Sequence, residues 1–457
     1  MADLDHPLPG STALDSRLAA LNGRLRESRA WSPPVVGKLV RVVGLTLEAS
    51  GLRVPIGSYC RITTDEPGGA VDAEVVGFAN DRLYLMPVGM VRGLRPGAKV
   101  MPLGRGGEVH VGRSLLGRVV GGTGEFIDEG GDPILNDRLP LLGEPINPFS
   151  RSLIREPMDI GIRAINALFT LGRGQRIGLF AGSGVGKSTL LGLMTRFSDA
   201  DVVVVGLIGE RGREVREFIH EILGPQGLAR AVVVAAPADD SPLTRLHGAW
   251  RATAMAEYFR ERGLRVLLLM DSLTRVAQAQ REIALAIGEP PVSKGYPPSV
   301  FTLLPRLVER AGNMGHGGSI TAIYTVLVEG DDLMDPVADT ARAILDGHIS
   351  LSREIADGGR YPAIDIANSV SRVTNRLLDD SQRQQVARFK ALYSIYQQNR
   401  DLINIGAYTP GTNARIDEAV LAHPRLEDFL RQGDNEKVSL DQSNRQLREL
   451  MDALIQI

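Results

Sequence analysis

Residues 180–190 read FAGSGVGKSTL, a glycine-rich segment that ends in Lys-Ser-Thr-Leu. The apolar run RIGLFA at 176–181 predicts a strand before the glycines, and KSTLLGLMTRF at 187–197 predicts a helix after them. A strand, a glycine-rich loop and a helix in this order are typical of a phosphate-binding loop, where backbone N–H groups and the helix N-terminus face phosphate oxygens. A strict loop of this kind has glycine where this chain has Ala181. We expect ordinary dihedral angles to suffice there, because the residue stands at the strand exit.

The loop also indicates which residues bind nucleotide. We expect Gly182, Gly184 and Gly186 to allow positive φ, so that consecutive N–H groups point at one phosphate. Lys187 would reach the β- and γ-phosphates, and the Ser188 hydroxyl would bind Mg²⁺. The alternative is a glycine-rich turn that precedes Lys-Ser by chance. The predicted nucleotide-binding residues of this segment are Gly182, Ser183, Gly184, Val185, Gly186, Lys187, Ser188 and Thr189.

Two further apolar runs lead into acidic residues. RVLLLMD at 265–271 ends in Asp271, and a carboxylate at the carboxyl end of a parallel strand could orient Mg²⁺ directly or through water. The alternative role for Asp271 is to cap the next helix. VVVVGLI at 202–208 leads into Glu210, which could polarise the water that attacks the γ-phosphate. The alternative is a surface ion pair within the charged segment that contains Glu210 and Arg211.

Composition limits the class of protein. A chain of 457 residues exceeds one typical core, so two or three domains are expected. The net charge of −2 gives no electrostatic reason to expect a nucleic-acid partner. The single cysteine, Cys60, excludes an internal disulfide and a cysteine-built metal site, and we expect it in an apolar core. The start of the chain does not resemble a secretory signal, and no apolar run approaches the ~20 residues that span a bilayer. These features predict a soluble, cytoplasmic protein that meets membranes only through partners.

The pattern of apolar residues changes along the chain. Short β-rich runs separated by glycine and proline predict a small antiparallel barrel. From about residue 150, continuous apolar strands alternate with helices, which indicates a mainly parallel α/β sheet covered on both faces. The expected fold is a P-loop NTPase core between that barrel and a C-terminal helical domain. The predicted divisions are an N-terminal amphipathic helix with Leu14, Leu18, Leu21 and Leu25 on one face (1–30), the barrel (31–105), the P-loop ATPase domain (106–375) and the helical domain (376–457).

The order of several long motifs resembles a known family. AGSGVGKS, GERGREVREF, DSLTRVAQAQREI, EGDDLMDPVADTARAILDGHISLSR and YPAIDIANSVSR follow one another as in the catalytic β subunits of rotary ATP synthases. The similarity is greater to the ATPases of type III protein export, and it extends from about residue 30 to residue 457. Within that group, VGLTLEASGLRVPIGSYCRI and DNEKVSLDQSNRQLREL resemble the flagellar branch more than the injectisome branch.

The resemblance implies roles for individual residues. Glu210 matches the catalytic carboxylate, and Arg211 beside it would contact the γ-phosphate. Tyr361 matches the aromatic residue that stacks on adenine, and Tyr408 would form a second adenine wall. Arg372 matches the arginine that reaches into the neighbouring subunit's site. Without the resemblance, Tyr361 reads as a core or turn aromatic and Arg372 as a solvated charge.

The resemblance also implies a function. It predicts an ATPase that uses ATP and Mg²⁺, assembles as a homohexamer and energises flagellar protein export at the inner membrane. The N-terminal helix would bind a stator-like regulatory protein, or else pack on its own barrel. The C-terminal helices would meet export-gate membrane proteins and chaperone–cargo complexes.

Three alternatives remain. The first is the same machine serving an injectisome, and the second is a rotary synthase subunit, which would need a distinct α partner. The third is an RNA translocase, which needs aromatic residues in a basic groove. Residues 35–105 contain only Tyr59, Phe78 and Tyr84 as aromatics.

Overall fold

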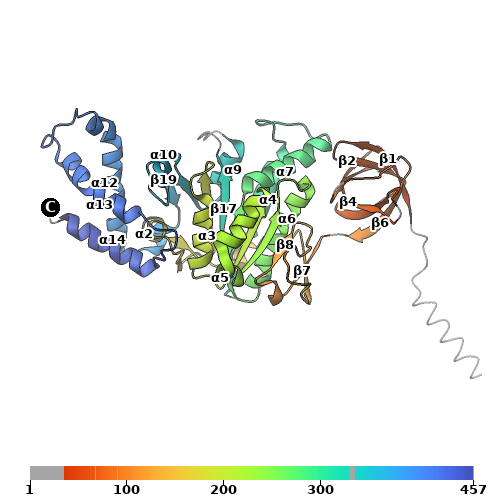
Figure 1. Cartoon of the computed structure of the whole chain (residues 1–457), viewed down its shortest axis with the longest axis horizontal. Coiled ribbons are helices and arrows are strands. Elements are labelled where there is room, and N and C mark those ends of the chain that lie inside the picture. Colours follow the sequence, from red (N-terminus) through yellow and green to blue (C-terminus); the bar gives the residue numbers. More distant parts are fainter. Residues whose placement is uncertain are drawn as a thin grey trace, which may run out of the picture.

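The computed structural model describes residues 35–66, 68–89, 91–105, 107–315, 317–328 and 335–455. A β-barrel, a central sheet with its helices and a group of C-terminal helices follow one another along the longest axis (Figure 1). The barrel and the C-terminal helices therefore lie at opposite ends of the molecule (Figure 1). The predicted helix with the Leu14–Leu25 face lies outside the described residues.

The barrel is closed and six-stranded, in the order β1-β2-β5-β4-β3-β6, as the spacing of its β-rich runs predicts. Alternate residues point inward, as Cys60 and Ile62 do in β3, and both are fully buried. The expectation for Cys60 is confirmed, since it is a free, buried core residue. The strands are β1 (Gly37–Val43), β2 (Thr46–Ser50), β3 (Ser58–Thr63), β4 (Ala70–Ala79), β5 (Arg82–Pro87) and β6 (Lys99–Arg105).

The barrel's aromatic residues do not form a stacking surface. Tyr59 turns toward the central part of the chain, where its hydroxyl lies 3.3 Å from His247 Nδ1. His247 Nε2 in turn lies 3.0 Å from the Glu74 carboxylate of the barrel. Tyr84 is half-buried and Phe78 is exposed, so one of the three aromatics faces solvent. Within the described residues, the barrel therefore lacks the surface of exposed aromatic residues that an RNA translocase would need for stacking bases.

The central sheet has nine strands, in the order β19-β18-β12-β17-β15-β13-β14-β8 with β16 beside β17. Every pair from β18 to β8 along this order is parallel, while β19 and β16 run antiparallel to their partners, so the expected mainly parallel sheet is confirmed. All of Val202–Ile208 is buried because both faces are covered. The strands are β8 (Val119–Gly121), β12 (Arg176–Ala181), β13 (Val202–Ile208), β14 (Ala231–Ala236), β15 (Arg265–Asp271), β16 (Gly312–Asn313), β17 (Ser319–Leu327), β18 (Gly347–Leu351) and β19 (Ile364–Ser371).

Helices cover the two faces of this sheet with separate apolar clusters. Val203 and Val205 of β13 pack with α3, and Val204 packs with α6. The helices of the central part are α2 (Arg163–Leu168), α3 (Lys187–Phe197), α4 (Gly212–Glu217), α5 (Gly224–Ala229), α6 (Pro242–Arg260), α7 (Leu273–Ala286), α8 (Pro298–Val308), α9 (Pro336–Ile344), α10 (Arg353–Asp357) and α11 (Thr374–Leu377). A π-helical turn, Phe218–Leu223, joins α4 to α5. The short strand pairs are β7 (Glu108–Val111) with β9 (Asp137–Pro140) and β10 (Pro157–Met158) with β11 (Leu171–Gly172).

Three long helices form the C-terminal part, as the polar helical pattern predicts. They are α12 (Asp380–Asn404), α13 (Ala414–Leu430) and α14 (Leu440–Ile455). Phe389 of α12 and Phe429 of α13 meet with ring centroids 5.5 Å apart, and both belong to the apolar cluster that contains α2 and α3. The C-terminal helices thus share a core with the phosphate-loop side of the sheet. Among the described helices, none combines the length and apolarity needed to cross a membrane.

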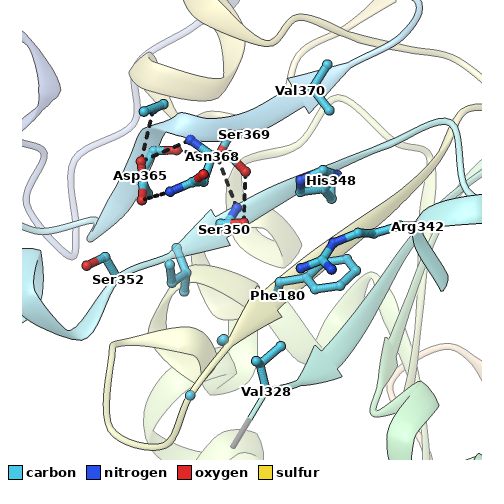
Figure 2. A pocket seen from close by; sticks show the side chains of 14 residues that line it. Phe180, Val328, Arg342, His348, Ser350, Ser352, Asp365, Asn368, Ser369 and Val370 are labelled. Carbon is cyan, nitrogen blue, oxygen red and sulfur yellow. Dashed lines mark hydrogen bonds between the residues drawn. The ribbon is translucent and has the colours of Figure 1, made fainter. Parts of the chain in front are cut away.

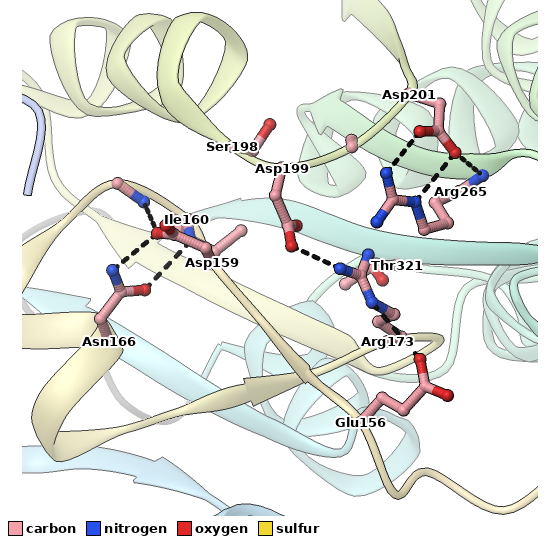
Figure 3. Close-up of polar contacts among 12 residues, drawn as sticks. Glu156, Asp159, Ile160, Asn166, Arg173, Ser198, Asp199, Asp201, Arg265 and Thr321 are labelled. Carbon is pink, nitrogen blue, oxygen red and sulfur yellow. Dashed lines mark hydrogen bonds and ion pairs between the residues drawn. The ribbon is translucent and has the colours of Figure 1, made fainter. Parts of the chain in front are cut away.

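Ion pairs hold the amino-terminal edge of the sheet, opposite the phosphate loop (Figure 3). Arg265 at the start of β15 makes a two-point contact with Asp201 just before β13, at 2.9 and 2.6 Å. Arg173 before β12 pairs with Asp199 and with Glu156. The Arg265–Asp201 pair joins the starts of the neighbouring strands β15 and β13, and the Arg173–Asp199 pair joins the segments before β12 and β13.

Candidate active site

The loop between β12 and α3 has the backbone that a phosphate cradle needs. Gly184 and Gly186 adopt positive φ, at 76° and 85°, and α3 begins at Lys187. Val185 is buried and anchors the loop on the core, whereas Ser183 and Gly184 face solvent. Arg353 of α10 donates to the Ser183 carbonyl at 2.8 Å. N–H groups at the open start of α3 are therefore free to meet an anion.

The expectation for Gly182 was wrong. It does not adopt positive φ, and it is the first residue after β12, which ends at Ala181. A Cβ added there would lie 3.7 Å from the Val328 carbonyl oxygen, an ordinary contact. Ala181 likewise fits as the last residue of the strand, where its carbonyl accepts from Val328 N at 3.2 Å. The departure from the strict motif thus falls on residues with ordinary backbone.

Three charged side chains from three strand ends meet behind the loop. Lys187 Nζ lies 2.7 Å from Asp271 Oδ1 and 3.3 Å from Glu210 Oε1. Thr325 of β17 donates to Asp271 Oδ1 at 2.6 Å. Their side chains are largely buried, with 12% of Lys187, 16% of Glu210 and 4% of Asp271 exposed. The alternative of a surface ion pair does not describe Glu210, and Ser272 rather than Asp271 accepts the capping bond of α7.

The cluster shifts the titration of its own members. Burial and, after it, the Asp271 carboxylate raise the pKa of Glu210 to about 7, although the Lys187 ammonium opposes the rise. Burial opposes the charge of Lys187, but Asp271 and Glu210 outweigh it and raise the Lys187 pKa above its usual value. A carboxyl that gains and loses a proton near neutral pH is suited to general-base work.

Arg211 points away from this cluster in the single chain. It caps α4 with extended backbone, its side chain is 78% exposed, and its Nη1 lies 3.6 Å from Glu214 Oε1. The surface ion pair that the sequence leaves open is therefore found at Arg211 rather than at Glu210.

Tyr361 lies against the phosphate loop. A Cβ on Gly186 would meet the Tyr361 ring at 3.3 Å, so ring and loop are in close contact. The ring is 44% exposed, which leaves room for a flat ligand on its free face. Its carbonyl accepts from Gln432 N at 3.0 Å. Tyr408, in contrast, bonds within its own segment, through its hydroxyl to Asp417 Oδ1 at 2.8 Å and to the Asn413 carbonyl at 3.1 Å. The segment joined to Tyr361 is instead the turn that contains Gln432.

Arg372 lies at the opposite edge of the sheet from the loop. It follows β19, which pairs antiparallel with β18, so that Ser371 stands opposite Gly347 at the start of β18. Gly347 lies roughly 10 Å or more, measured along the strands, from the end of β12 where the loop begins. The exposed Arg372 side chain donates to the Arg342 carbonyl at 3.0 Å. The chain does not bring Arg372 to its own phosphate loop.

A cavity of about 510 Å³ lies between β12, the two last strands of the sheet and α9 (Figure 2). Arg342 lies over the Phe180 ring at 5.0 Å, and His348 contacts the same ring (Figure 2). Lys187, Glu210 and Asp271 do not line this cavity. It reaches the base of the loop at Ala181 and Gly182 but is separate from the charged cluster.

Oxygen donors near the start of α3 suit Mg²⁺. Ser188 exposes its hydroxyl beside Lys187, and Asp271 contacts Lys187 from β15. Among the described residues, no group of three or more His, Cys, Asp or Glu is arranged as a metal site. Mg²⁺ bound with a nucleotide takes only one or two protein oxygens, together with phosphates and waters, so this donor set fits it.

Comparisons with known proteins agree with this architecture. The beta-barrel domain and the nucleotide-binding domain of the ATP synthase alpha/beta family match residues 39–104 and 161–371, and the T3SS EscN ATPase C-terminal domain matches residues 378–449. The flagellum-specific ATP synthase of Pseudomonas aeruginosa is 57% identical over 422 residues, which cover 92% of this chain and 94% of the relative. The chain belongs to the ATP synthase alpha/beta family. Its resemblance to the type III export ATPases is thereby confirmed.

Two more relatives and two solved structures match most of this chain. The flagellum-specific ATP synthase of Salmonella typhimurium is 56% identical and covers 89% of this chain and 91% of its own, and the type 3 secretion system ATPase of Xanthomonas euvesicatoria is 50% identical, with 87% and 89% covered. The assembled ATPase EscN of enteropathogenic E. coli has a TM-score of 0.86 at 42% identity, with 91% of this chain and 99% of that chain covered. EscN in complex with its central stalk EscO has a TM-score of 0.83 at 41% identity, with the same coverage. This export ATPase therefore hydrolyses ATP, and the flagellar reading is the better supported of the two branches.

Three residues near the site escaped the sequence reasoning. Thr325 is one of several buried polar residues of β17, and nothing in the local sequence distinguishes it from Ser319 or Thr321. Arg353 holds the loop at Ser183 and stands in a segment that resembles the family, without a motif of its own. Gln432 is buried beside Tyr361, and nothing in its local sequence distinguishes it.

Proposed function

We propose that this export ATPase hydrolyses MgATP at a seam between identical subunits, and that the energy drives flagellar protein export. The observation that carries the proposal is the Lys187–Asp271–Glu210 cluster behind a left-handed glycine loop. The chain's identity with flagellum-specific ATP synthases supports the biological setting. Binding alone needs the loop and the lysine, whereas hydrolysis also needs a group that orients and deprotonates water.

Lys187 is the residue that the phosphates would recruit. Without nucleotide its charge is balanced by two carboxylates at 2.7 and 3.3 Å. A triphosphate in the loop would offer Lys187 a more highly charged partner, and N–H groups at the start of α3 would share that charge. Asp271 and Glu210 would then be released from the ammonium for other contacts.

Glu210 is the proposed general base. It follows β13 in a largely buried position, and burial raises its pKa to about 7. At that value the carboxylate is a stronger base than an exposed glutamate, yet it is still ionised in half of the molecules at neutral pH. It would take a proton from the water that attacks the γ-phosphate.

Ser188 and Asp271 would hold Mg²⁺, the first by its hydroxyl and the second directly or through water. When bound, the ion would neutralise charge on the β- and γ-phosphates. Thr325 fixes the Asp271 carboxylate by its 2.6 Å bond, so that the oxygen stays at the strand end when Lys187 turns to phosphate.

Arg372 would complete the site of the next subunit. It lies at the far edge of its own sheet, where its side chain donates to a carbonyl of α9. An arginine supplied in trans stabilises the charge of the transition state and is worth about 10³–10⁵ in rate. Arg211 is a second candidate for γ-phosphate contact once it leaves Glu214. Tyr361 would stack on adenine, and Tyr408 would approach the base only if α12–α13 moved.

The proposed assembly is a homohexameric ring in the cytoplasm, peripheral to the inner-membrane export apparatus. EscN, whose structure covers 91% of this chain, has been solved as an assembled ATPase and in complex with its central stalk. A ring gives every loop one Arg372 from its neighbour, because the interface is head-to-tail. The N-terminal helix would bind a stator-like regulatory protein, and the C-terminal helices would meet export-gate proteins and chaperone–cargo complexes.

Subunit mixing tests the shared site. Lys187→Ala removes phosphate binding but keeps Arg372, and Arg372→Ala does the reverse, so each variant alone should be nearly inactive. In a 1:1 mixture about a quarter of the seams join an intact loop to an intact arginine, and ATPase activity should return to about that fraction. Arg376→Ala, an exposed arginine of α11, is the matched control and should be active alone. No recovery on mixing, with assembled rings confirmed, would contradict the shared site.

Gene deletion in the source bacterium tests the setting. Secretion of flagellar subunits should fall and be restored by the wild-type gene but not by Lys187→Ala. Unchanged flagellar export with loss of an injectisome substrate would favour the other branch.

A further inference from the structure

The turn between α13 and α14, residues 431–439, contacts two parts of the nucleotide site; it is called the hinge turn below. Gln432 N donates to the Tyr361 carbonyl at 3.0 Å. Arg196, near the end of the phosphate-loop helix α3, donates to Asn435 Oδ1 at 3.0 Å and to the Asp434 carbonyl at 2.7 Å. The turn thus joins the C-terminal helices to both the loop helix and the proposed base-stacking residue.

The Gln432 side chain is the buried centre of the hinge turn. It is 6% exposed, and its amide uses both hydrogens and its oxygen. Nε2 donates to the Gly161 carbonyl at 2.8 Å and to the Glu436 carbonyl at 2.7 Å. Oε1 accepts from Arg163 N at 2.7 Å. Two carbonyls and one N–H surround the group, so only an amide in this orientation satisfies all three.

The partner segment, residues 159–166, is itself rigidly held. Asn166 Nδ2 donates to Asp159 Oδ1 at 2.8 Å, and Ile160 N donates to Asn166 Oδ1 at 3.0 Å (Figure 3). Asn166 Nδ2 also donates to the Val438 carbonyl at 3.1 Å, at the far end of the hinge turn. The turn is therefore fixed near both ends to one buried segment of the central part.

We propose that Gln432 is a positioning residue that sets the affinity for the base of the nucleotide. It holds the hinge turn against residues 159–166, and the turn holds Tyr361 by its carbonyl while the Tyr361 ring lies on Gly186. The same contacts link α13 and α14 to the base pocket, so a movement of these helices against the sheet would act on Tyr361 through the turn. The inference rests on the proposed stacking of Tyr361 on adenine.

The test compares a ligand with a base and one without. ADP and pyrophosphate both occupy a phosphate loop, but only ADP reaches Tyr361. Their affinities are measured by calorimetry at fixed Mg²⁺ for wild type, Gln432→Glu and Gln432→Met in the full chain. Gln432→Glu turns an oxygen toward the Gly161 and Glu436 carbonyls, and Gln432→Met keeps the length without hydrogen bonds. We expect ADP to bind about tenfold more weakly to both variants, and pyrophosphate to change by less than about twofold.

The matched control is Gln442→Glu. Gln442 is exposed on α14, and its Oε1 accepts from Ser439 N, a role that a carboxylate keeps. It should leave both affinities unchanged. Pyrophosphate binding reports that the loop of each variant is folded, and the KM for ATP should rise in the Gln432 variants while kcat is retained.

The variant Tyr361→Ala tests the stacking of Tyr361 on adenine separately from the role of Gln432. It should bind ADP about tenfold more weakly and pyrophosphate with unchanged affinity, as expected for loss of base stacking. An unchanged ADP affinity in Tyr361→Ala would overturn the stacking itself. If ADP affinity falls in Tyr361→Ala but not in the Gln432 variants, the role of Gln432 is overturned. Equal weakening of ADP and pyrophosphate in the Gln432 variants would show a general structural role and overturn it as well.

Discussion

At the scale of single residues, the site keeps a lysine between two carboxylates where the phosphates would bind. Lys187 supplies one positive charge against Asp271 and Glu210, so the nucleotide-free cluster carries an excess of negative charge. Burial makes that excess unfavourable, and the proton affinity of Glu210 rises in response. The negative charge of the nucleotide-free cluster therefore favours binding of a metal cation, which would replace the Lys187 ammonium beside the carboxylates.

Glu210→Gln should abolish hydrolysis and spare binding. The amide keeps the size and the oxygen that faces Lys187 but cannot take a proton from water, so kcat should fall about 10²–10⁴-fold. ADP affinity should stay within about threefold of wild type, since the loop and Lys187 are intact. Steady-state ATPase assays and calorimetry measure the two quantities. Glu217→Gln, an exposed glutamate of α4, is the control; hydrolysis by Glu210→Gln at the wild-type rate would remove Glu210 from the mechanism.

The same variant should change how stability depends on pH. The pKa of Glu210 is about 7 in the fold and 4.5 without it, so the folded protein holds a proton between these values that the unfolded chain has lost. Stability from this group is therefore lost as pH rises through that window. Glu210→Gln should match wild type near pH 4.5 and exceed it by about 1–3 kcal/mol at pH 8. Thermal unfolding across pH measures the difference, which a pH-independent offset would contradict.

At the scale of elements, local sequence patterns predict the strands and helices but not the residues that distant elements bring to the site. The run from RIGLFA through KSTLLG predicts strand, loop and helix because each signal lies within a few residues. The expectation of positive φ at Gly182 failed, because a glycine in the sequence shows that positive φ is allowed but not that it is adopted. Thr325 and Gln432 could not be found this way, since strand order and the approach of α13 to the sheet bring them to the site. Arg372 was found only by resemblance, and its place at the opposite edge follows from the antiparallel turn of β19.

Gly182 and Gly186 of the loop should therefore tolerate alanine differently. Gly186→Ala forces a side chain into φ 85° and places its Cβ 3.3 Å from the Tyr361 ring, so it should lose about 1–2 kcal/mol of stability. Gly182→Ala meets only a carbonyl oxygen at 3.7 Å with ordinary backbone, and nucleotide-free protein should unfold within about 0.5 kcal/mol of wild type. Denaturant unfolding of both variants measures this. Equal losses would contradict the assigned backbone.

At the scale of the whole molecule, the residues proposed for catalysis lie at two opposite edges of the same sheet. The loop, Lys187 and Glu210 are at the carboxyl edge, and Arg372 is at the amino edge beyond β18. No rearrangement inside a parallel sheet brings these edges together, because the strands between them are buried on both faces. If Arg372 is catalytic as proposed, a complete site needs a second copy of the chain.

Specific ATPase activity should accordingly rise with protein concentration. An unassembled chain lacks the arginine, whose contribution of about 10³–10⁵ in rate corresponds to roughly 4–7 kcal/mol of barrier. Activity per chain should climb steeply over the range where light scattering detects assembly, and Arg372→Ala should assemble over the same range without that climb. Wild-type activity that stays constant per chain from monomer to ring would mean that each chain carries a complete site. Arg372 would then have to reach the loop of its own subunit by a rearrangement of the sheet, and the burial of the strands on both faces makes such a rearrangement unfavourable.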